Sequence, residues 1–153
     1  SEVVRVIWDK REIDVSDLLK MFWECHDPTQ KNRQGNDMGT QYRSAIYYKN
    51  ENNIKTILAS KEQYQTELSK KNLGLIETEI KMIDSYFYAE QYHQQYLASA
   101  GSRQYCSASP TKVKLGVFTG SNYKLEDHIW ENFNWEVDKC VLRSDNNPIK
   151  NNI

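Results

Sequence analysis

Hydrophobic and polar positions repeat with different periods in different parts of the chain, which predicts a mixture of strands and helices. Residues 3–8 are β-branched or aromatic apart from Arg5 and predict a strand almost at the start. A helix is expected from about Ser16, a candidate N-cap, because apolar residues then recur three and four positions apart. Alternating residues at 42–48 predict a second strand.

The clearest periodic element is a long helix expected at about 51–70. Its apolar residues fall on one side, and Gly74 supplies a stop soon after. Residues 76–82 then alternate between apolar and polar, as a strand with one buried face requires. Three aromatic residues at 86–88, expected in the core or in a pocket wall, lead into a short helix predicted at 92–97.

Two stretches lack this periodicity. From 26 to 41 only Met38 is apolar, and a loop of this length without secondary structure is more often functional than accidental. After residue 100 the pattern loosens, with a weak strand predicted at 113–118 and disorder at 138–153. Three strands and two main helices favour an α+β fold, a two-layer sandwich with helices packed on one sheet face.

The composition describes one modest domain. The chain has 153 residues, and apolar residues reach 39% even with ten Tyr counted, which predicts a small core. A net charge of −1 excludes the basic footprint of a typical nucleic-acid-binding protein. No apolar run approaches the roughly 18 residues of a membrane span. We therefore expect neither nucleic acid nor a membrane among the partners.

The cysteines are odd in number and lie far apart, at Cys25, Cys106 and Cys140. The sequence has no Cys-x-x-Cys pair and no His-rich tract, so it predicts no zinc site. Such thiols favour a reducing compartment, which we take to be the cytoplasm, and they stay available for redox chemistry there.

The most specific text of the chain is QGNDMGTQYRS at 34–44, which joins the polar loop to the second predicted strand. Together with other matches, this string resembles the peptide methionine sulfoxide reductase A family. The remaining matches are EVVRV at 2–6, FWE at 22–24, HDPTQ at 26–30, AIY at 45–47, AE at 89–90, YHQQYL at 92–97 and YC at 105–106. The resemblance implies a ferredoxin-like core, a partial reductase domain at 1–106 and a partly disordered extension at 107–153.

One family feature is missing from these 153 residues. The family's nucleophile is a Cys in a Gly-Cys-Phe-Trp motif, and the sequence contains no such motif. Cys25 follows a Phe-Trp pair instead of preceding it, so we interpret it as structural or incidental. By comparison with the family, the chain resembles the C-terminal part of a reductase without its first strand, nucleophile helix and second strand.

The resemblance assigns roles to four residues. Glu2 is the expected carboxylic acid that protonates the sulfoxide oxygen, and a partly dry environment with a raised pKa suits that task. Tyr42 is the expected hydroxyl donor to the same oxygen. Asp37 is expected to help hold the substrate and a bound water. Cys106 matches the thiol that converts a sulfenic acid to a disulfide, and Cys140 stays open as a second candidate.

The resemblance therefore implies a peptide-methionine (S)-S-oxide reductase, a protein-repair oxidoreductase of oxidative stress that acts on oxidised proteins and on free methionine sulfoxide. No metal or organic cofactor is expected, since thioredoxin or another dithiol is the reductant. We expect a monomer. The alternative is a truncated, non-catalytic chain that at most binds oxidised methionine or a partner.

Overall fold

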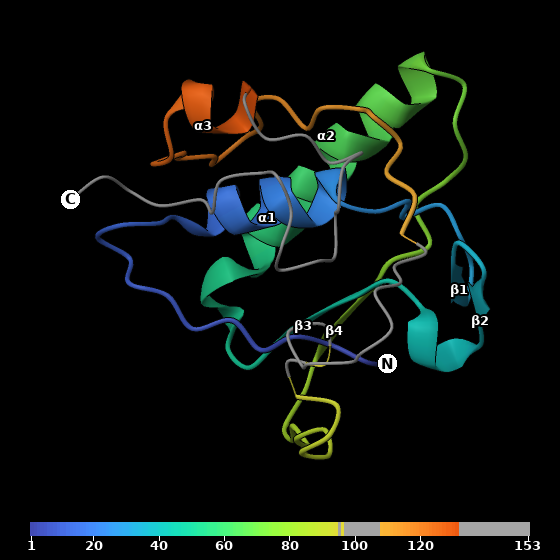
Figure 1. Ribbon diagram of the computed structural model, residues 1–153. Helices are drawn as coiled ribbons and strands as arrows, with labels where there is room; N and C mark the ends of the chain where they lie inside the picture. Colours follow the sequence, from blue (N-terminus) through green and yellow to red (C-terminus); the bar gives the residue numbers. More distant parts are fainter. Residues whose placement is uncertain (95, 97–107, 132–153) are drawn as a thin grey trace.

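The computed structural model describes residues 1–94, 96 and 108–131 (Figure 1). Its first helix is α1 (Val15–Glu24). Asp14 is the N-cap, because its Oδ1 accepts the Ser16 N–H at 2.9 Å while Asp17 Oδ2 accepts the Asp14 N–H at 2.9 Å. This reciprocal pair is a capping box. The prediction of Ser16 as the cap is therefore wrong by two residues, although the helix itself is confirmed.

A strand–helix–strand unit forms the centre of the fold. Strand β3 (Ala45–Tyr48) leads through a short 3-10 turn, η2 (Glu51–Asn53), into helix α2 (Ile54–Lys70), and the chain returns as β4 (Glu79–Met82). The two strands are parallel, with Ala45 paired to Glu79, because a helical crossover joins them. The long helix and these two strands confirm the predicted elements, with both strands shorter than predicted.

The polar loop at 26–41 is more ordered than the sequence predicts. Strands β1 (Arg33–Gln34) and β2 (Asp37–Met38) form a small antiparallel hairpin around Gly35, whose φ of 57° suits a glycine in a tight turn. A 3-10 turn, η1 (Thr40–Tyr42), then joins the hairpin to β3. The expectation of a structureless loop is therefore wrong.

Three further predictions differ from the structure. Residues 3–8 are not a strand, and Val4 is 87% exposed. Residues 113–118 are also irregular. Val113 and Leu115 are buried on either side of exposed Lys114, but the alternation fails at Val117, which is exposed. The helix predicted at 92–97 is found only as a turn at 91–94, and its end lies outside the described residues. The disorder predicted at 138–153 also lies outside them.

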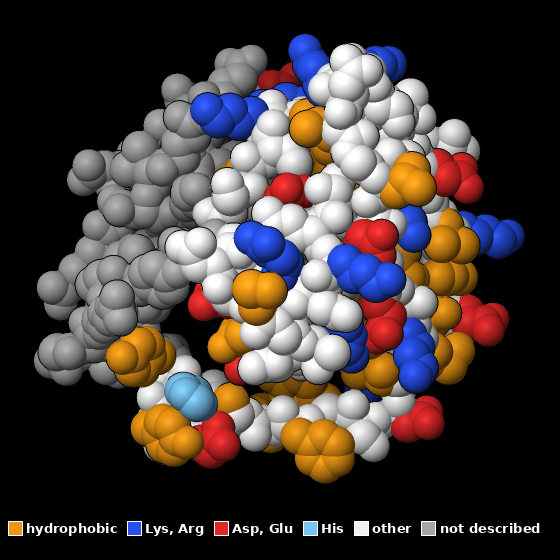
Figure 2. Space-filling model, turned by 90° about the vertical axis from the view of Figure 1, so that its right-hand side faces the viewer, with side chains coloured by type: hydrophobic (Ala, Val, Ile, Leu, Met, Phe, Trp, Pro, Cys, Tyr) orange, Lys and Arg blue, Asp and Glu red, His pale blue; other side chains and the backbone are white. Residues whose placement is uncertain are grey.

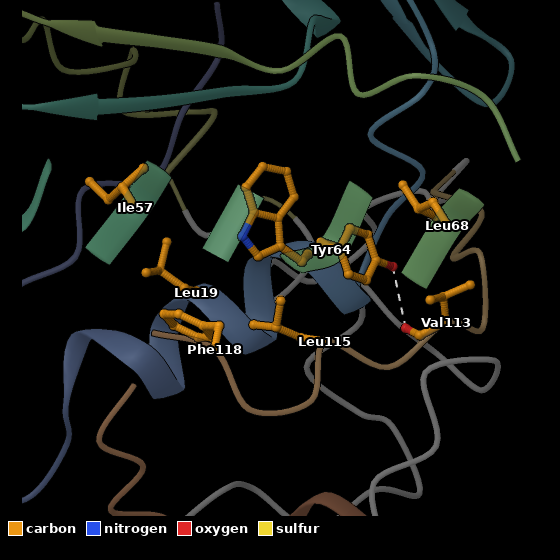
Figure 3. Packing of buried hydrophobic residues seen from close by; sticks show 8 residues of the cluster. Leu19, Ile57, Tyr64, Leu68, Val113, Leu115 and Phe118 are labelled. Atoms are coloured by element: carbon orange, nitrogen blue, oxygen red, sulfur yellow. Dashed lines mark hydrogen bonds between the residues drawn. The ribbon is translucent and has the colours of Figure 1, made fainter. Parts of the chain in front are cut away.

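The core lies between the two helices and the segment that follows residue 108 (Figure 3). Trp23 of α1 stacks on Tyr64 of α2 at 5.7 Å between ring centroids, and both are fully buried. The Trp23 indole donates to Ser60 Oγ at 2.9 Å, so its polar atom is satisfied. Side chains packed around this pair complete the cluster: Leu19, Ile57, Leu68, Val113, Leu115 and Phe118.

The helices cover one face of the β3–β4 pair, and residues 111–125, here called the strap, cross their other face (Figure 3). The resulting α+β class confirms the prediction. The predicted domain limit at residue 106 stays a prediction, and the strap adds buried apolar side chains to the same core as the helices. Within the described residues no helix has the length and apolar character to cross a membrane.

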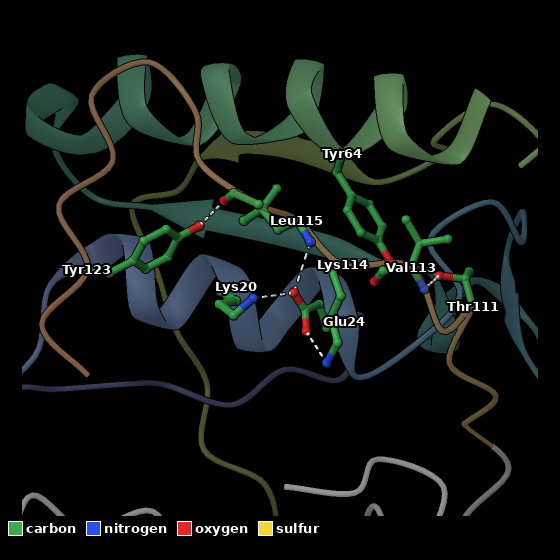
Figure 4. A network of polar contacts seen from close by, with 9 residues as sticks. Lys20, Glu24, Tyr64, Thr111, Val113, Lys114, Leu115 and Tyr123 are labelled. Carbon is green, nitrogen blue, oxygen red and sulfur yellow. Dashed lines mark hydrogen bonds and ion pairs between the residues drawn. The ribbon is translucent and has the colours of Figure 1, made fainter. Parts of the chain in front are cut away.

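Carboxylates of α1 hold the strap in place (Figure 4). Glu24 is 2% exposed, and its Oε1 accepts the Leu115 N–H at 2.9 Å and the Lys20 ammonium at 2.6 Å. Its Oε2 pairs with Lys114 Nζ at 3.3 Å. Asp17 likewise accepts the backbone N–H groups of residues 124 and 125. Side-chain acceptors thus replace the sheet partner that the strap lacks.

Candidate active site

The first residues lie along the turn that carries Tyr42. The Glu2 N–H donates to the Gln41 carbonyl at 2.8 Å, and the Ser1 hydroxyl donates to the Arg43 carbonyl at 2.8 Å. Glu2 is exposed, which differs from the partly dry position expected for the acid, and Tyr42 is half-buried. The structure therefore brings the predicted acid next to the residue that precedes the predicted hydroxyl donor, across a long stretch of sequence.

The hairpin sets the positions of Asp37 and Tyr42. Asp37 lies in β2, half-buried and paired with Gln34 of β1. Gly39 follows with a φ of 137°, a conformation that strains other residues, and its N–H donates to Asn32 O at 2.9 Å. The Tyr42 N–H then donates to the Gly39 carbonyl at 3.0 Å. A tight chain reversal thus fixes where the turn leaves the hairpin.

A cavity of about 1030 Å³ opens beside Glu2. Its wall is rich in aromatic side chains and comes from three places in the chain, which are the first three residues, β3 and the segment after β4. The lining includes Ser1, Glu2, Val3, Tyr47, Ile83, Tyr86, Phe87, Tyr88, Glu90, Tyr92 and Tyr96. Asp37 and Tyr42 are not among the lining residues, and Cys106 lies outside the described residues. Of the three predicted site residues that the structure describes, Glu2 alone lines this cavity.

The aromatic residues at 86–88 form a pocket wall, one of the two places predicted for them. Arg5 lies over the Tyr86 ring at 5.2 Å and the Tyr88 ring at 4.9 Å, and it also donates to the Tyr88 hydroxyl. Phe87 is 88% exposed. Figure 2 shows hydrophobic side chains gathered along the lower edge of the molecule, beside an exposed histidine and an opening.

Buried polar contacts fix the frame behind this site. His26 donates from Nδ1 to the Phe22 carbonyl at 2.7 Å, which leaves Nε2 to accept from Ser44 Oγ at 2.8 Å. Ser44 Oγ also contacts Thr78 Oγ1 at 2.8 Å. Burial lowers the pKa of His26 to about 4, so the ring is neutral near pH 7. The chain of contacts joins the end of α1 to the residues that immediately precede β3 and β4.

Cys25 lies in the environment of an unreactive thiol. Its Sγ donates to the Phe22 carbonyl at 3.4 Å. Burial raises its pKa to about 11, with the neighbouring Glu24 charge as a further cause. Because the thiolate is the nucleophilic form, such a thiol is inert near neutral pH. Within the described residues, no group of three or more His, Cys, Asp and Glu is arranged to hold a metal ion.

Sequence reasoning missed a polar cluster on the exposed face of the β3–β4 pair. Arg43, Tyr47 and Glu79 contact one another there, and Tyr47 also lines the cavity. The alternation at 42–48 places Arg43 and Tyr47 on one face, which was the available signal. Their partner Glu79 comes from another strand, so the pairing register is needed to find it.

Comparison with known proteins gives a family match for most of the chain. The family model described as "Peptide methionine sulfoxide reductase" matches residues 1–124. The mitochondrial peptide methionine sulfoxide reductase of Mus musculus is 51% identical over 113 residues, which cover 74% of this chain and 48% of that protein. Peptide methionine sulfoxide reductase MsrA of Vibrio vulnificus is 50% identical over 113 residues, covering 74% and 54%.

A solved structure gives a similar result. Mxr1 from Saccharomyces cerevisiae in reduced form superposes with a TM-score of 0.53 at 37% identity, over 59% of this chain and 48% of the other. The chain spans about half the length of the curated relatives it matches. The family match also continues past residue 106 into the strap.

Proposed function

This chain belongs to the peptide methionine sulfoxide reductase family, and we propose that it supplies the acid, the hydroxyl donor and the resolving thiol of a peptide-methionine (S)-S-oxide reductase. The observation that carries the proposal is the hydrogen bond from Glu2 to the turn ending in Tyr42. It keeps the backbone of Glu2 beside the residue that precedes Tyr42, and Glu2 itself lines a cavity rich in aromatic side chains. That combination suits a small polar group attached to an apolar methionine side chain.

In the proposed reaction a thiolate attacks the sulfoxide sulfur, and the oxygen passes to the thiol as a sulfenic acid while methionine leaves. Glu2 donates a proton to that oxygen, and the Tyr42 hydroxyl stabilises the charge that develops on it. Asp37 holds the substrate and a bound water. A second thiol then attacks the sulfenic acid, which forms a disulfide and releases water. The overall change is one sulfoxide reduced and two thiols oxidised.

The proposed second thiol is Cys106, and a dithiol of the thioredoxin type then reduces the disulfide. The proposed substrates are methionine-S-sulfoxide in oxidised proteins and free methionine sulfoxide. We propose no metal or organic cofactor, a monomeric state and a cytoplasmic location. The nucleophile belongs to a Gly-Cys-Phe-Trp motif, which the 153 residues do not contain. That observation supports a second candidate, a chain that binds oxidised methionine without reducing it.

The test uses this chain joined to an upstream segment that carries Gly-Cys-Phe-Trp. We expect the joined protein to reduce methionine-S-sulfoxide peptides and not the R diastereomer. Glu2→Gln should lower kcat about a hundredfold with little change in KM, because the proton is needed only as the oxygen departs. The matched control is Glu62→Gln on the exposed side of α2, which should leave kcat unchanged. Equal kcat for wild type and Glu2→Gln would remove Glu2 from its role.

A separate prediction concerns recycling in the same joined protein. Cys106→Ser should leave the first turnover intact and slow thioredoxin-driven recycling far more than Cys140→Ser does. Loop-closure entropy differs little between the two positions, because doubling a loop costs only about 0.6 kcal/mol. Access therefore decides, and a disulfide needs Cα atoms within roughly 7 Å. Stopped-flow single turnovers and steady-state rates separate the two steps. If recycling slows in Cys140→Ser but not in Cys106→Ser, Cys140 is the resolving thiol instead of Cys106.

A further inference from the structure

The two faces of the β3–β4 pair differ sharply in their chemistry. The inner face presents Ser44, Ile46 and Ile80 to the helices, where they are buried or half-buried. The outer face presents Tyr47 of β3, Arg43 from just before that strand, and Glu79 of β4. In the parallel register Glu79 pairs with Ala45, so its side chain stands between those of Arg43 and Tyr47.

The outer residues form one connected cluster. The Tyr47 hydroxyl donates to Glu79 Oε1 at 2.5 Å. Arg43 Nη2 donates to the Tyr47 oxygen at 2.8 Å and lies 3.4 Å from Glu79 Oε1. The hydrogen bond from Tyr47 and the positive charge of Arg43 lower the pKa of the Glu79 carboxyl, so it is ionised near neutral pH. Burial and the Glu79 carboxylate raise the pKa of Tyr47, so the phenol keeps its proton.

The same guanidinium also reaches the turn that carries Tyr42. Arg43 Nη1 donates to the carbonyl of Thr40, the first residue of η1, at 2.7 Å. The turn is thereby fastened to both strands through one side chain. Its other side is held by the first residues, through the Glu2 N–H and the Ser1 hydroxyl. Tyr47 connects this cluster to the cavity, because its side chain lines the cavity together with Glu2.

We propose that Arg43 is the positioning residue of this site, holding the η1 turn so that the Tyr42 hydroxyl and the Glu2 carboxyl address the same sulfoxide oxygen. The inference rests on the proposed function for its substrate. The planar fork of arginine is essential, because two of its nitrogens serve the turn and the strands at once. A lysine ammonium is a single point and cannot span both sets of acceptors in fixed geometry.

The experiment uses the 153-residue chain itself, because neither turn geometry nor substrate binding requires the nucleophile. Amide hydrogen exchange of Tyr42 and Arg43 reports the turn, since both N–H groups donate within it. Binding of a methionine-S-sulfoxide peptide, compared with its thioether form, reports the site by NMR titration. We expect Arg43→Ala to speed Tyr42 amide exchange and to weaken sulfoxide binding about tenfold, with thioether binding unchanged.

Two comparisons separate positioning from general destabilisation. Millimolar guanidinium chloride should restore slow exchange and sulfoxide preference in Arg43→Ala, whereas Arg43→Lys should recover them only in part. The matched control is Arg11→Ala, which removes an exposed guanidinium paired with Asp9 and should change neither readout. The proposal is overturned if Arg43→Ala leaves the rate of Tyr42 amide exchange unchanged. It is also overturned if guanidinium chloride fails to restore slow exchange and sulfoxide preference in Arg43→Ala. A wild-type chain without sulfoxide preference, but with the expected turn response, refutes the proposed function while supporting the positioning role.

Discussion

The 153-residue chain, expressed alone, is expected to reduce a methionine-S-sulfoxide peptide no faster than dithiothreitol does without protein. The sequence holds the proposed acid and hydroxyl donor but no Gly-Cys-Phe-Trp motif. Thiolate attack is the covalent step of the proposed reaction, and Glu2 and Tyr42 supply only protons and hydrogen bonds. Without a nucleophile the 153-residue chain should therefore show no turnover.

Cys25 is not expected to act as the nucleophile in this chain. With a pKa raised to about 11 by burial, it carries about a hundredfold less thiolate than an ordinary thiol at neutral pH. Its Sγ also donates to the Phe22 carbonyl, so it is directed into the helix end. We therefore expect Cys25→Ser to leave the background rate unchanged, and joining a Gly-Cys-Phe-Trp segment to restore turnover.

The measurement is the release of methionine from a synthetic peptide, followed by chromatography with and without protein. Turnover by the chain alone, well above the buffer rate, would overturn the prediction. In that case single Cys→Ser variants identify the thiol responsible. Binding without turnover supports the non-catalytic candidate for the chain as it stands, because that candidate requires only the sulfoxide site.

Local patterns predicted the elements whose stabilisation is local. Helix α2 shows a regular apolar face in the sequence, and Ile57, Tyr64 and Leu68 of that face are buried in the core with Trp23, although Leu58 is exposed. The start of α1 was misplaced because Asp14 and Ser16 are both good caps, and only the reciprocal bond from Asp17 decides between them. The Gly35-Asn36 turn of the hairpin was a readable signal that the polar composition of the loop concealed.

The remaining errors come from partners that are distant in sequence. Residues 3–8 have strong β propensity, but a strand requires a neighbouring strand, and within the described residues they have none. The strap buries Val113 and Leu115 on either side of exposed Lys114, as a strand would, yet its Leu115 N–H goes to a helix carboxylate instead of a sheet. Nothing local marks Glu24 as buried, since glutamate on a helix is usually exposed.

The candidate site shows the same division between local and distant information. Asp37 and Tyr42 were identified from a resemblance in one continuous stretch of sequence, and the hairpin explains their spacing. The neighbourhood of Glu2 and the η1 turn depends on a hydrogen bond between distant parts of the chain. The cluster of Arg43, Tyr47 and Glu79 depends on strand register in the same way. Periodicity alone specifies neither.

Glu24→Ala is expected to lower the free energy of unfolding by about 3–5 kcal/mol, a large part of the stability of a small domain. The substitution leaves the buried Leu115 N–H without its acceptor and removes the anion between Lys20 and Lys114. Glu24→Gln should cost less, because its amide oxygen still accepts one hydrogen bond while the charge is lost. Urea unfolding followed by tryptophan fluorescence measures both differences.

The matched control is Glu67→Ala, since Glu67 also pairs with a lysine on a helix but its side chain is 26% exposed. Glu67→Ala should lower the free energy of unfolding by under about 1 kcal/mol, as expected for a solvent-screened ion pair. Equal effects at both positions would contradict the assigned role of Glu24. A further readout locates the damage, because a strap released from α1 should expose the Leu115 amide to rapid hydrogen exchange while the Trp23–Tyr64 contact persists. If the amides of α2 instead lose protection at the same rate as the Leu115 amide, the strap and the helical core unfold as one unit. The strap's buried Leu115 and Phe118 side chains, which pack in that core, would account for this result.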